Sequence, residues 1–232
     1  TGGACSAALM SDDRIVCEQF IHNKLTHSVH LMTLIDNCMK LSGLTIKQMD
    51  AFGVTVGPGS FTGIRIGMCA IKGFCQLTDR PAIAIDTLDA IARGICCHNG
   101  IIVPIMDARR GQVYTGIYAC ADNELKVMEE QMAVPIEELG EKLKKYLKEG
   151  RRVTFLGDGV PVHKTKITEE ILPGEAVTFA PANMNRQRAA SVGTLGMQYY
   201  KEGKIETAME HEPEYLRVSQ AERERKERME HV

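Results

Sequence analysis

A glycine-rich turn between a β-rich segment and a long apolar helix is the feature that most constrains the fold. Residues 51–56 carry Phe, Val and Thr side chains and predict a short strand, and the turn GPGSFTG (57–63) follows at once. Ser60 is a suitable cap for a helix over 60–77. Because a strand that turns directly into a helix is typical of α/β proteins, the turn predicts that fold class.

The helix expected over 60–77 is apolar almost all round. Its polar side chains fall in one narrow seam, formed by Thr62, Arg65, Lys72 and Gln76. Gly63 and Gly67 lie four residues apart and would let another helix approach closely. Such a helix must be covered on nearly every side.

The segment 26–42 predicts a second helix with a broad apolar arc, and Gly43 ends it. Methionine is common on adaptable contact surfaces. We therefore expect both helices to pack on their own sheet with one side and on a partner protein with the other; simple burial between sheet and lobe is the alternative. The expected partner surface consists of Met32, Ile35, Met39, Phe61, Gly63, Ile64, Ile66, Gly67, Ala70 and Ile71.

Strands followed by alternating helices and strands occur twice along the chain, without a repeat at the level of residues. We expect an N-terminal lobe over 1–98, which carries the partner helices, and a C-terminal lobe over 99–232, whose tail from about 213 could pack back on the first lobe. The expected elements span 4–9, 14–21, 26–42, 51–56, 60–77, 81–85, 87–97, 101–106, 112–119, 125–134, 135–148 and 152–156.

The glycine turn could also hold a phosphate, since a helix start offers unpaired N–H groups. The P-loop lysine spacing is absent, and the dinucleotide pattern GxGxxG does not follow in register. A tight turn whose glycines merely permit positive φ is therefore the favoured interpretation, and phosphate binding is the alternative. The residues of the candidate nucleotide site are Gly2, Gly3, Gly57, Gly59 and Ser60.

The composition is that of an ordinary globular protein, with 44% hydrophobic and 25% charged residues among 232. The net charge of −2 lacks the positive field that nucleic-acid binders use, so another protein is expected to hold most of any RNA. Apolar runs fall short of the roughly 20 residues that a spanning helix needs, and no charged-then-apolar leader opens the sequence. We expect a cytoplasmic protein.

Neither the cysteines nor the histidines form a metal-binding pattern. The eight cysteines are scattered and contain no CxxC pair, so we expect reduced thiols in the core. His22, His27 and His30 have no acidic cluster nearby, and no metal is expected.

The stretch VTVGPGSFTGIRIG (54–67) resembles the signature of the TsaB (YeaZ) family, subunits of the bacterial threonylcarbamoyladenosine machinery. Further similar stretches are THS (26–28), MDARRG (106–111), PEYLR (213–217) and SQAERE (219–224). The resemblance covers essentially the whole chain.

The resemblance implies an actin-like ATPase fold (ASKHA, ribonuclease H-like) with two lobes of similar topology. It implies a subunit without catalytic residues or cofactors, which pairs with the catalytic paralogue TsaD and the ATPase TsaE and reaches tRNA through the complex. Because an exposed apolar face invites self-association, we also expect a homodimer through the same helices when no partner is present. Thr87 and Ile91 stand where TsaD has two metal-binding histidines. The alternative is a glycoprotease-like metallopeptidase or an ATPase of the same fold.

The sequence departs from the family at its start. Family members begin with a strand and an aspartate before the residue that matches Thr1. A sheet without that inner strand would leave backbone donors unpaired, so trimming or disorder is the expected explanation.

Overall fold

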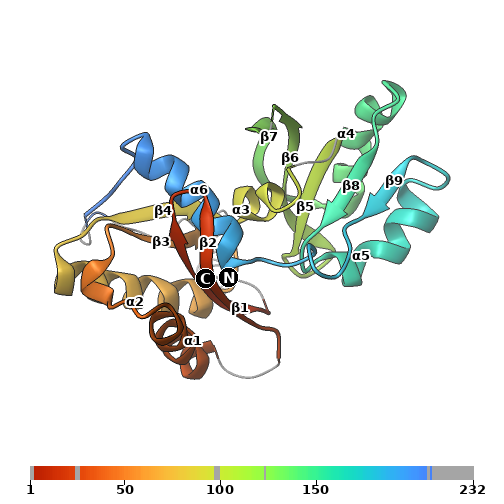
Figure 1. Ribbon diagram of the computed structural model, residues 1–232. Helices are drawn as coiled ribbons and strands as arrows, with labels where there is room; N and C mark the ends of the chain where they lie inside the picture. Colours follow the sequence, from red (N-terminus) through yellow and green to blue (C-terminus); the bar gives the residue numbers. More distant parts are fainter. Residues whose placement is uncertain (1–2, 24–26, 97–99, 123, 208–209, 211–232) are drawn as a thin grey trace, which may run out of the picture.

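The computed structural model describes residues 3–23, 27–96, 100–122, 124–207 and 210. Two α/β lobes lie side by side, with α3 (Thr87–Arg93) between them (Figure 1). The expected division between residues 98 and 99 and the tail from 213 both fall outside the described residues.

The first lobe begins with an antiparallel hairpin of β1 (Cys5–Ser11) and β2 (Arg14–Ile21). Asp12 turns the chain with a positive φ of 52°, a conformation that aspartate tolerates better than most residues. Helix α1 (His27–Ser42) packs on this hairpin, and Gly43 follows it in the left-handed region. The predicted hairpin and helix are confirmed.

The second pair of strands in this lobe is parallel. β3 (Phe52–Gly57) pairs with β4 (Ala82–Asp86), and α2 (Phe61–Thr78) makes the crossover. A short 3-10 turn, η1 (Ile46–Gln48), precedes β3. The predicted strand, glycine turn and helix are confirmed. In the described residues, the pairs β1–β2 and β3–β4 are separate two-stranded sheets.

The second lobe is built on a five-stranded sheet with the order β7-β6-β5-β8-β9. Its strands are β5 (Ile101–Asp107), β6 (Gln112–Ala121), β7 (Glu124–Pro135), β8 (Val153–Leu156) and β9 (Val177–Phe179). Helix α4 (Ile136–Lys148) has Glu137 and Glu138 in its first turn and lysines in its last, an order that suits the helix dipole. Helix α5 (Val160–Lys166) continues into the π-helical turn η2 (Ile167–Ile171).

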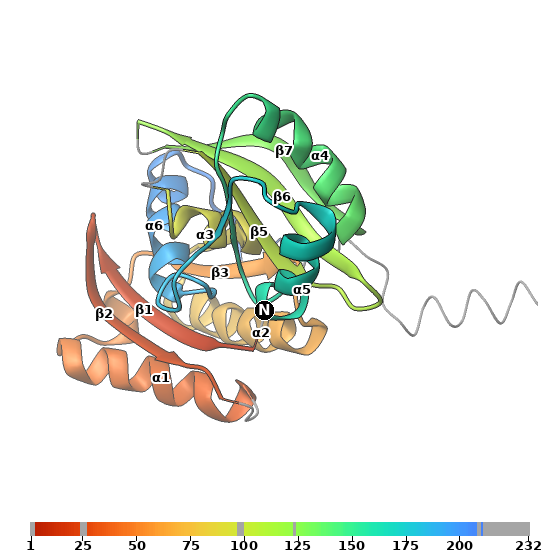
Figure 2. The ribbon, with the colours of Figure 1, turned by 90° about the vertical axis from the view of Figure 1, so that its right-hand side faces the viewer.

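Helix α6 (Ala189–Lys201) returns to the first lobe and packs on β1, β3 and β4. Figure 2 shows α6 on the side of these strands opposite α1 and α2. Residues 189–201 therefore lie with the first lobe in space, although the expected C-terminal lobe includes them.

Two cysteines depart from the expectation of reduced thiols. Cys96 and Cys120 form a disulfide, with their Cα atoms 5.2 Å apart, within the range that a disulfide spans. Scattered positions in the sequence could not reveal the pair, because the fold brings the end of α3 against β6. The other cysteines of the described residues are free, and burial raises the pKa of the Cys38 thiol to about 12.

Candidate protein-binding site

The glycine turn places α2 against the end of β3. Gly57 has a φ of 145°, which favours glycine, and lies opposite Asp86 of β4. The Ser60 hydroxyl accepts a hydrogen bond from the Gly63 N–H at 3.3 Å, and the Ser60 carbonyl accepts one from the Ile64 N–H at 2.9 Å. Ser60 is therefore the helix cap that the sequence predicted.

The residues of the candidate nucleotide site occupy different places. Gly3 lies beside the His22 side chain at the open end of the hairpin, whereas Gly57 lies in the β3–β4 pair. Gly59 and Ser60 continue the same turn, and Gly2 is outside the described residues. The Gly63 N–H, which could otherwise bind a phosphate, already donates a hydrogen bond to the Ser60 hydroxyl. Nucleotide binding stays a prediction.

Helix α2 presents two different faces. Ile64, Met68 and Cys75 point into the lobe and are buried. Phe61 is 43% exposed, with the Arg65 guanidinium 3.9 Å from the centre of its ring, and Leu77 is exposed near the other end. Part of the apolar wheel seen in the sequence is thus buried in the core, and apolar side chains near both ends of the helix remain exposed.

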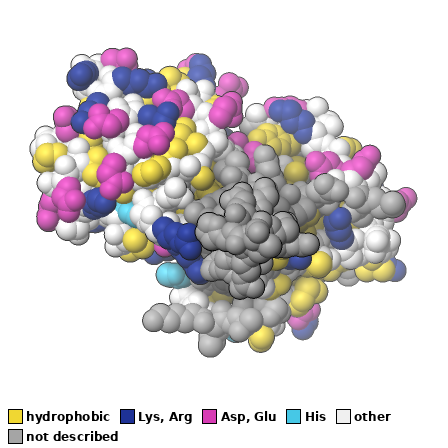
Figure 3. Space-filling model, turned by 180° about the vertical axis from the view of Figure 1, so that it is seen from behind, with side chains coloured by type: hydrophobic (Ala, Val, Ile, Leu, Met, Phe, Trp, Pro, Cys, Tyr) yellow, Lys and Arg dark blue, Asp and Glu magenta, His cyan; other side chains and the backbone are white. Residues whose placement is uncertain are grey.

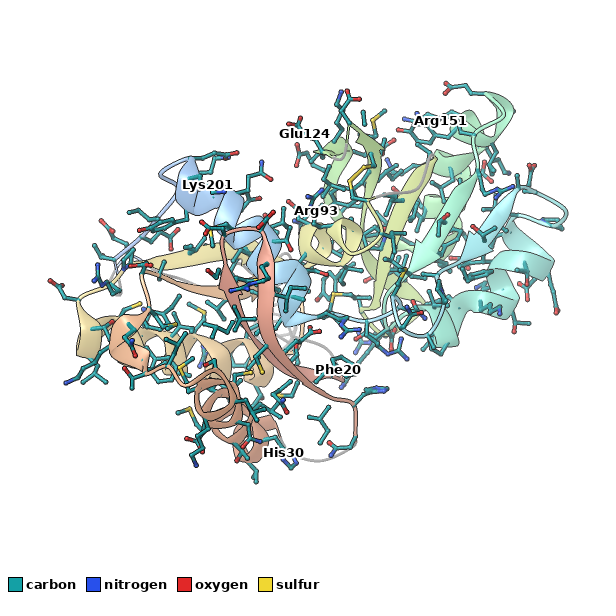
Figure 4. The ribbon with its side chains drawn as sticks, viewed as in Figure 1. Phe20, His30, Arg93, Glu124, Arg151 and Lys201 are labelled. Atoms are coloured by element: carbon teal, nitrogen blue, oxygen red, sulfur yellow. A yellow bond between two sulfur atoms is a disulfide. The ribbon has the colours of Figure 1, made fainter. Side chains whose placement is uncertain are left out.

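Helix α1 also buries some of its apolar side chains and exposes others. Leu34 and Cys38 are buried against the hairpin. Val29, Met32 and Leu41 are exposed, and the Leu41 side chain retains 74% of its accessible surface. Figure 4 shows His30 on this helix, which lies beside α2. We call the exposed apolar residues of the two helices the partner surface: Val29, Met32, Leu41, Phe61 and Leu77.

The ten residues expected to meet a partner lie in three environments. Met32 and Phe61 are exposed. Ile64 is 1% exposed and belongs to the core, so its inclusion is wrong: the wheel could not tell which apolar direction faces the sheet. The remaining seven line a cavity inside the lobe: Ile35, Met39, Gly63, Ile66, Gly67, Ala70 and Ile71. The sequence analysis missed Val29, Leu41 and Leu77, although all three lie in the apolar arcs.

This cavity has a volume of about 570 Å³ and lies between β1 and β3. Helices α1 and α2 border it on one side and α6 on the other. Gln187, just before α6, also lines it, and its side chain is buried beside the Asp158 carboxyl.

A second polar group lies at the end of the β5 and β8 strands. His163 is buried, and its Nε2 lies 3.9 Å from the Asp107 Oδ1; burial lowers the pKa of His163, and the Asp107 charge opposes this. Burial raises the pKa of Asp158 in the loop after β8.

The two residues that the resemblance matches to TsaD histidines are packed in the interior. Thr87 and Ile91 begin and continue α3, and both are buried. Within the described ranges, no group of three or more His, Cys, Asp or Glu side chains could hold a metal ion. None of the helices in this part of the chain combines the length and the hydropathy that crossing a bilayer requires.

Comparison with known proteins gives consistent matches. The family model of tRNA N6-adenosine threonylcarbamoyltransferase, TsaD, matches residues 16–225. The tRNA threonylcarbamoyladenosine biosynthesis protein TsaB of Bacillus subtilis (strain 168) is 32% identical over 215 residues, which cover 93% of this chain and 90% of that protein. TsaB of Escherichia coli (strain K12) is 30% identical over 218 residues, 92% and 90% of the two chains.

Solved structures show the same fold. YeaZ from Pseudomonas aeruginosa superposes with a TM-score of 0.78 at 21% identity, over 93% of this chain and 95% of that one. A further Pseudomonas aeruginosa structure, described as similar to peptidase YEAZ, gives a TM-score of 0.76 at 20% identity, with the same coverage. The expected α/β, actin-like fold is confirmed. The chain belongs to the TsaB (YeaZ) family.

Proposed function

We propose that this chain is the non-catalytic partner subunit of the assembly that forms threonylcarbamoyladenosine in tRNA. In this proposal it pairs with a TsaD-type paralogue, which carries the transferase site, and works with the ATPase TsaE in the cytoplasm. The observation that carries the proposal is the partner surface of α1 and α2, found in a chain of the TsaB family.

The exposed apolar side chains of the partner surface are concentrated on two adjacent helices. Single exposed hydrophobic side chains are normal on soluble proteins, but here five large ones share two adjacent helices. Complete burial of one such side chain contributes roughly 1.5–3 kcal/mol. Burying even half of this surface would therefore favour association strongly, before the entropic cost of binding is subtracted.

The charge distribution suits a subunit that leaves most tRNA contacts to others. Acidic and basic side chains intermingle over the second lobe (Figure 3), and the whole chain has a net charge of −2. A protein that bound the tRNA phosphate backbone without a partner would be expected to have a stripe of basic side chains.

The interior of α3 supports a role without transfer chemistry. Ile91 offers no metal ligand, and the buried Thr87 hydroxyl has no hydrogen-bond partner among the described residues. To bind a metal as the TsaD histidines do, this chain would need histidines in place of both Thr87 and Ile91. In this proposal the paralogue supplies the Lewis acid.

The partner surface can also pair two copies of this chain when the paralogue is absent. A self-complementary apolar face is enough for a two-fold dimer. This homodimer is part of the proposal, and the paralogue would compete with it for the same residues.

The test is co-purification of the chain with a tagged TsaD-type paralogue. Met32→Asp and Phe61→Asp each place a charge in the proposed interface and should abolish pairing. Val162→Asp is the matched control, because Val162 is also an exposed apolar residue, on α5 in the other lobe. Each variant should unfold at the same urea concentration as the wild type, since all three side chains are exposed.

Light scattering of the chain alone separates the two associations. The same two variants should be monomeric at concentrations where the wild type and Val162→Asp are dimeric. Normal recovery of the paralogue with both Met32→Asp and Phe61→Asp would disprove the proposed surface.

A further inference from the structure

The inner side of α1 brings three cysteines together. Cys5 of β1, Cys17 of β2 and Cys38 of α1 belong to one apolar cluster, which lies between the hairpin and this helix (Figure 2). Within the described ranges these thiols do not form a group that could hold a metal ion. Neighbouring thiols can nevertheless react with each other through disulfide exchange.

The register of the hairpin places Cys17 close to Cys38. Cys17 lies opposite Leu9, two positions along β1 from Ala7, and its side chain packs on the face that α1 covers. The Cys38 thiol donates a hydrogen bond to the Ala7 carbonyl oxygen at 3.6 Å, and it also interacts with the Cys17 thiol. The two sulfur atoms are therefore neighbours, although their residues belong to different elements.

The three thiols differ in their access to solvent. Cys38 is 2% exposed and Cys5 is 9% exposed, whereas Cys17 is only half-buried. Burial raises the pKa of the Cys38 thiol to about 12 and also raises the pKa of Cys5. Because a thiol must ionise and meet its reagent in order to react, a reagent from solution reaches this cluster at Cys17.

We propose that Cys17 and Cys38 are a thiol–disulfide site, at which a small disulfide such as oxidised glutathione links β2 to α1. The Cys17 thiolate attacks one sulfur of oxidised glutathione, and one glutathione leaves as its thiolate. The Cys38 thiolate then attacks the Cys17 sulfur of this mixed disulfide and releases the second glutathione. The two protein thiols are oxidised to one disulfide, oxidised glutathione is reduced to two glutathione molecules, and these take up the two protons.

The new bond fixes α1 on the hairpin. It closes a loop of roughly 20 residues, a constraint that acts on every state in which the helix leaves the strands. Cys38 lies on the buried side of α1, and Met32 of the partner surface lies on the exposed side. Oxidation therefore restricts the movement of this helix and leaves its outer side chains uncovered. The thiol pair does not depend on the proposed function.

The test is incubation of the reduced chain with oxidised glutathione, followed by trypsin digestion without reductant and mass spectrometry. Trypsin cuts after Arg14, Lys24 and Lys40, so the three cysteines fall in separate peptides, 1–14, 15–24 and 25–40. Peptides 15–24 and 25–40 should become linked to each other. A transient adduct of one glutathione on 15–24 should precede this link.

Serine variants separate the two steps. Cys38→Ser should retain glutathione on Cys17, because the thiol that would release it is missing. Cys17→Ser should leave Cys38 without glutathione, because Cys38 is buried. Cys5→Ser is the control and should form the same linked peptides as the wild type. The linked peptides of the wild type test the proposal even if a variant does not fold.

Hydrogen exchange measures the effect on α1. Amides of α1 should exchange several-fold more slowly in the oxidised chain than in the reduced chain, because the disulfide restricts local opening. Amides of β8 and β9, in the second lobe, should exchange equally fast in both. Cys17→Ser treated with oxidised glutathione should show no slowing in α1.

Four outcomes would overturn the proposal. The first is no reaction at Cys17, and the second is a glutathione that stays on Cys17 in the wild type. The third is a link between peptides 1–14 and 25–40 in place of the expected one, since Cys5 would then be the neighbour of Cys38. The fourth is equal exchange of the α1 amides in the oxidised and reduced chains.

Discussion

Arg188 donates hydrogen bonds from its Nε to both carboxylate oxygens of Glu18, at 3.3 and 3.2 Å, although 170 residues separate them. The second oxygen also pairs with the guanidinium Nη2. The first oxygen accepts the N–H of Ala190 at 3.1 Å, in the first turn of α6. Glu18 therefore fastens the N-terminus of α6 to the hairpin, beside the cavity between β1 and β3.

Replacing this carboxylate should destabilise the first lobe. Glu18→Gln keeps the size of the side chain but removes the charge that pairs with Arg188 and caps α6. We expect a loss of about 1–2 kcal/mol in the free energy of unfolding, because Arg188 is partly exposed and solvent weakens the pair. Urea unfolding at pH 7 measures the loss.

The control for this loss is Asp36→Asn on α1. Asp36 pairs with Lys40 at 2.6 Å, but both side chains are largely exposed. Its replacement should cost less than about 0.5 kcal/mol. Equal losses from the two variants would show that Glu18 acts as an ordinary surface charge.

Two helical glycines should respond to alanine in opposite directions. A Cβ on Gly140 of α4 would lie 2.1 Å from the Ile171 Cγ2, whereas a Cβ on Gly73 of α2 would meet nothing within 4 Å. Gly140→Ala should lower the free energy of unfolding by about 1–3 kcal/mol, because the added methyl group overpacks the contact with Ile171. Gly73→Ala should raise the free energy of unfolding by about 0.5–1 kcal/mol, because alanine has a higher helix propensity than glycine. Thermal unfolding compares them, and a gain in both would contradict the tight packing of α4 on η2.

Stability should fall in alkaline solution because of buried phenols. Burial and the nearby Asp89 and Asp86 charges raise the pKa of Tyr199 to about 12, and burial raises that of Tyr118 further. The unfolded chain loses these protons near pH 10, so the folded state is favoured fully below pH 10 and progressively less above it. Each phenol contributes a slope of about −1.4 kcal/mol per pH unit.

Single phenylalanine variants separate the two tyrosines. Tyr199→Phe should remove one such slope between pH 10 and 12 in urea unfolding. Tyr118→Phe should also remove one slope above pH 10, and below pH 10 it should lower the free energy of unfolding by about 1 kcal/mol, since the Tyr118 hydroxyl donates to the Asp89 Oδ1 at 2.7 Å. Stability curves parallel to that of the wild type would contradict the buried phenols.

The fold of the first 156 residues could be predicted because its signals are local. Alternation, capping by Ser60 and the glycine turn each depend on a few neighbouring residues, and every strand and helix expected in this range is present within a few residues of its expected bounds. The elements after β8 were not predicted. Of these, β9 has three residues and α6 is identified by its packing on the first lobe rather than by its sequence.

The candidate site was predictable only in part, because sequence patterns do not show which apolar side faces the protein's own core. Ile64 and Met32 are equally hydrophobic in the pattern, yet one is buried and the other half exposed. The Cys96–Cys120 pair likewise depends on a contact across 24 residues.

The most direct measurement is the amount of threonylcarbamoyladenosine formed in tRNA by a reconstituted system, determined by mass spectrometry of the digested RNA. The system contains the TsaD-type paralogue, TsaE, ATP, a threonylcarbamoyl donor and this chain. We predict that the modified nucleoside forms with the wild type and Val162→Asp, and falls to background without the chain or with Met32→Asp. Full modification in the absence of the chain would contradict the role of partner subunit.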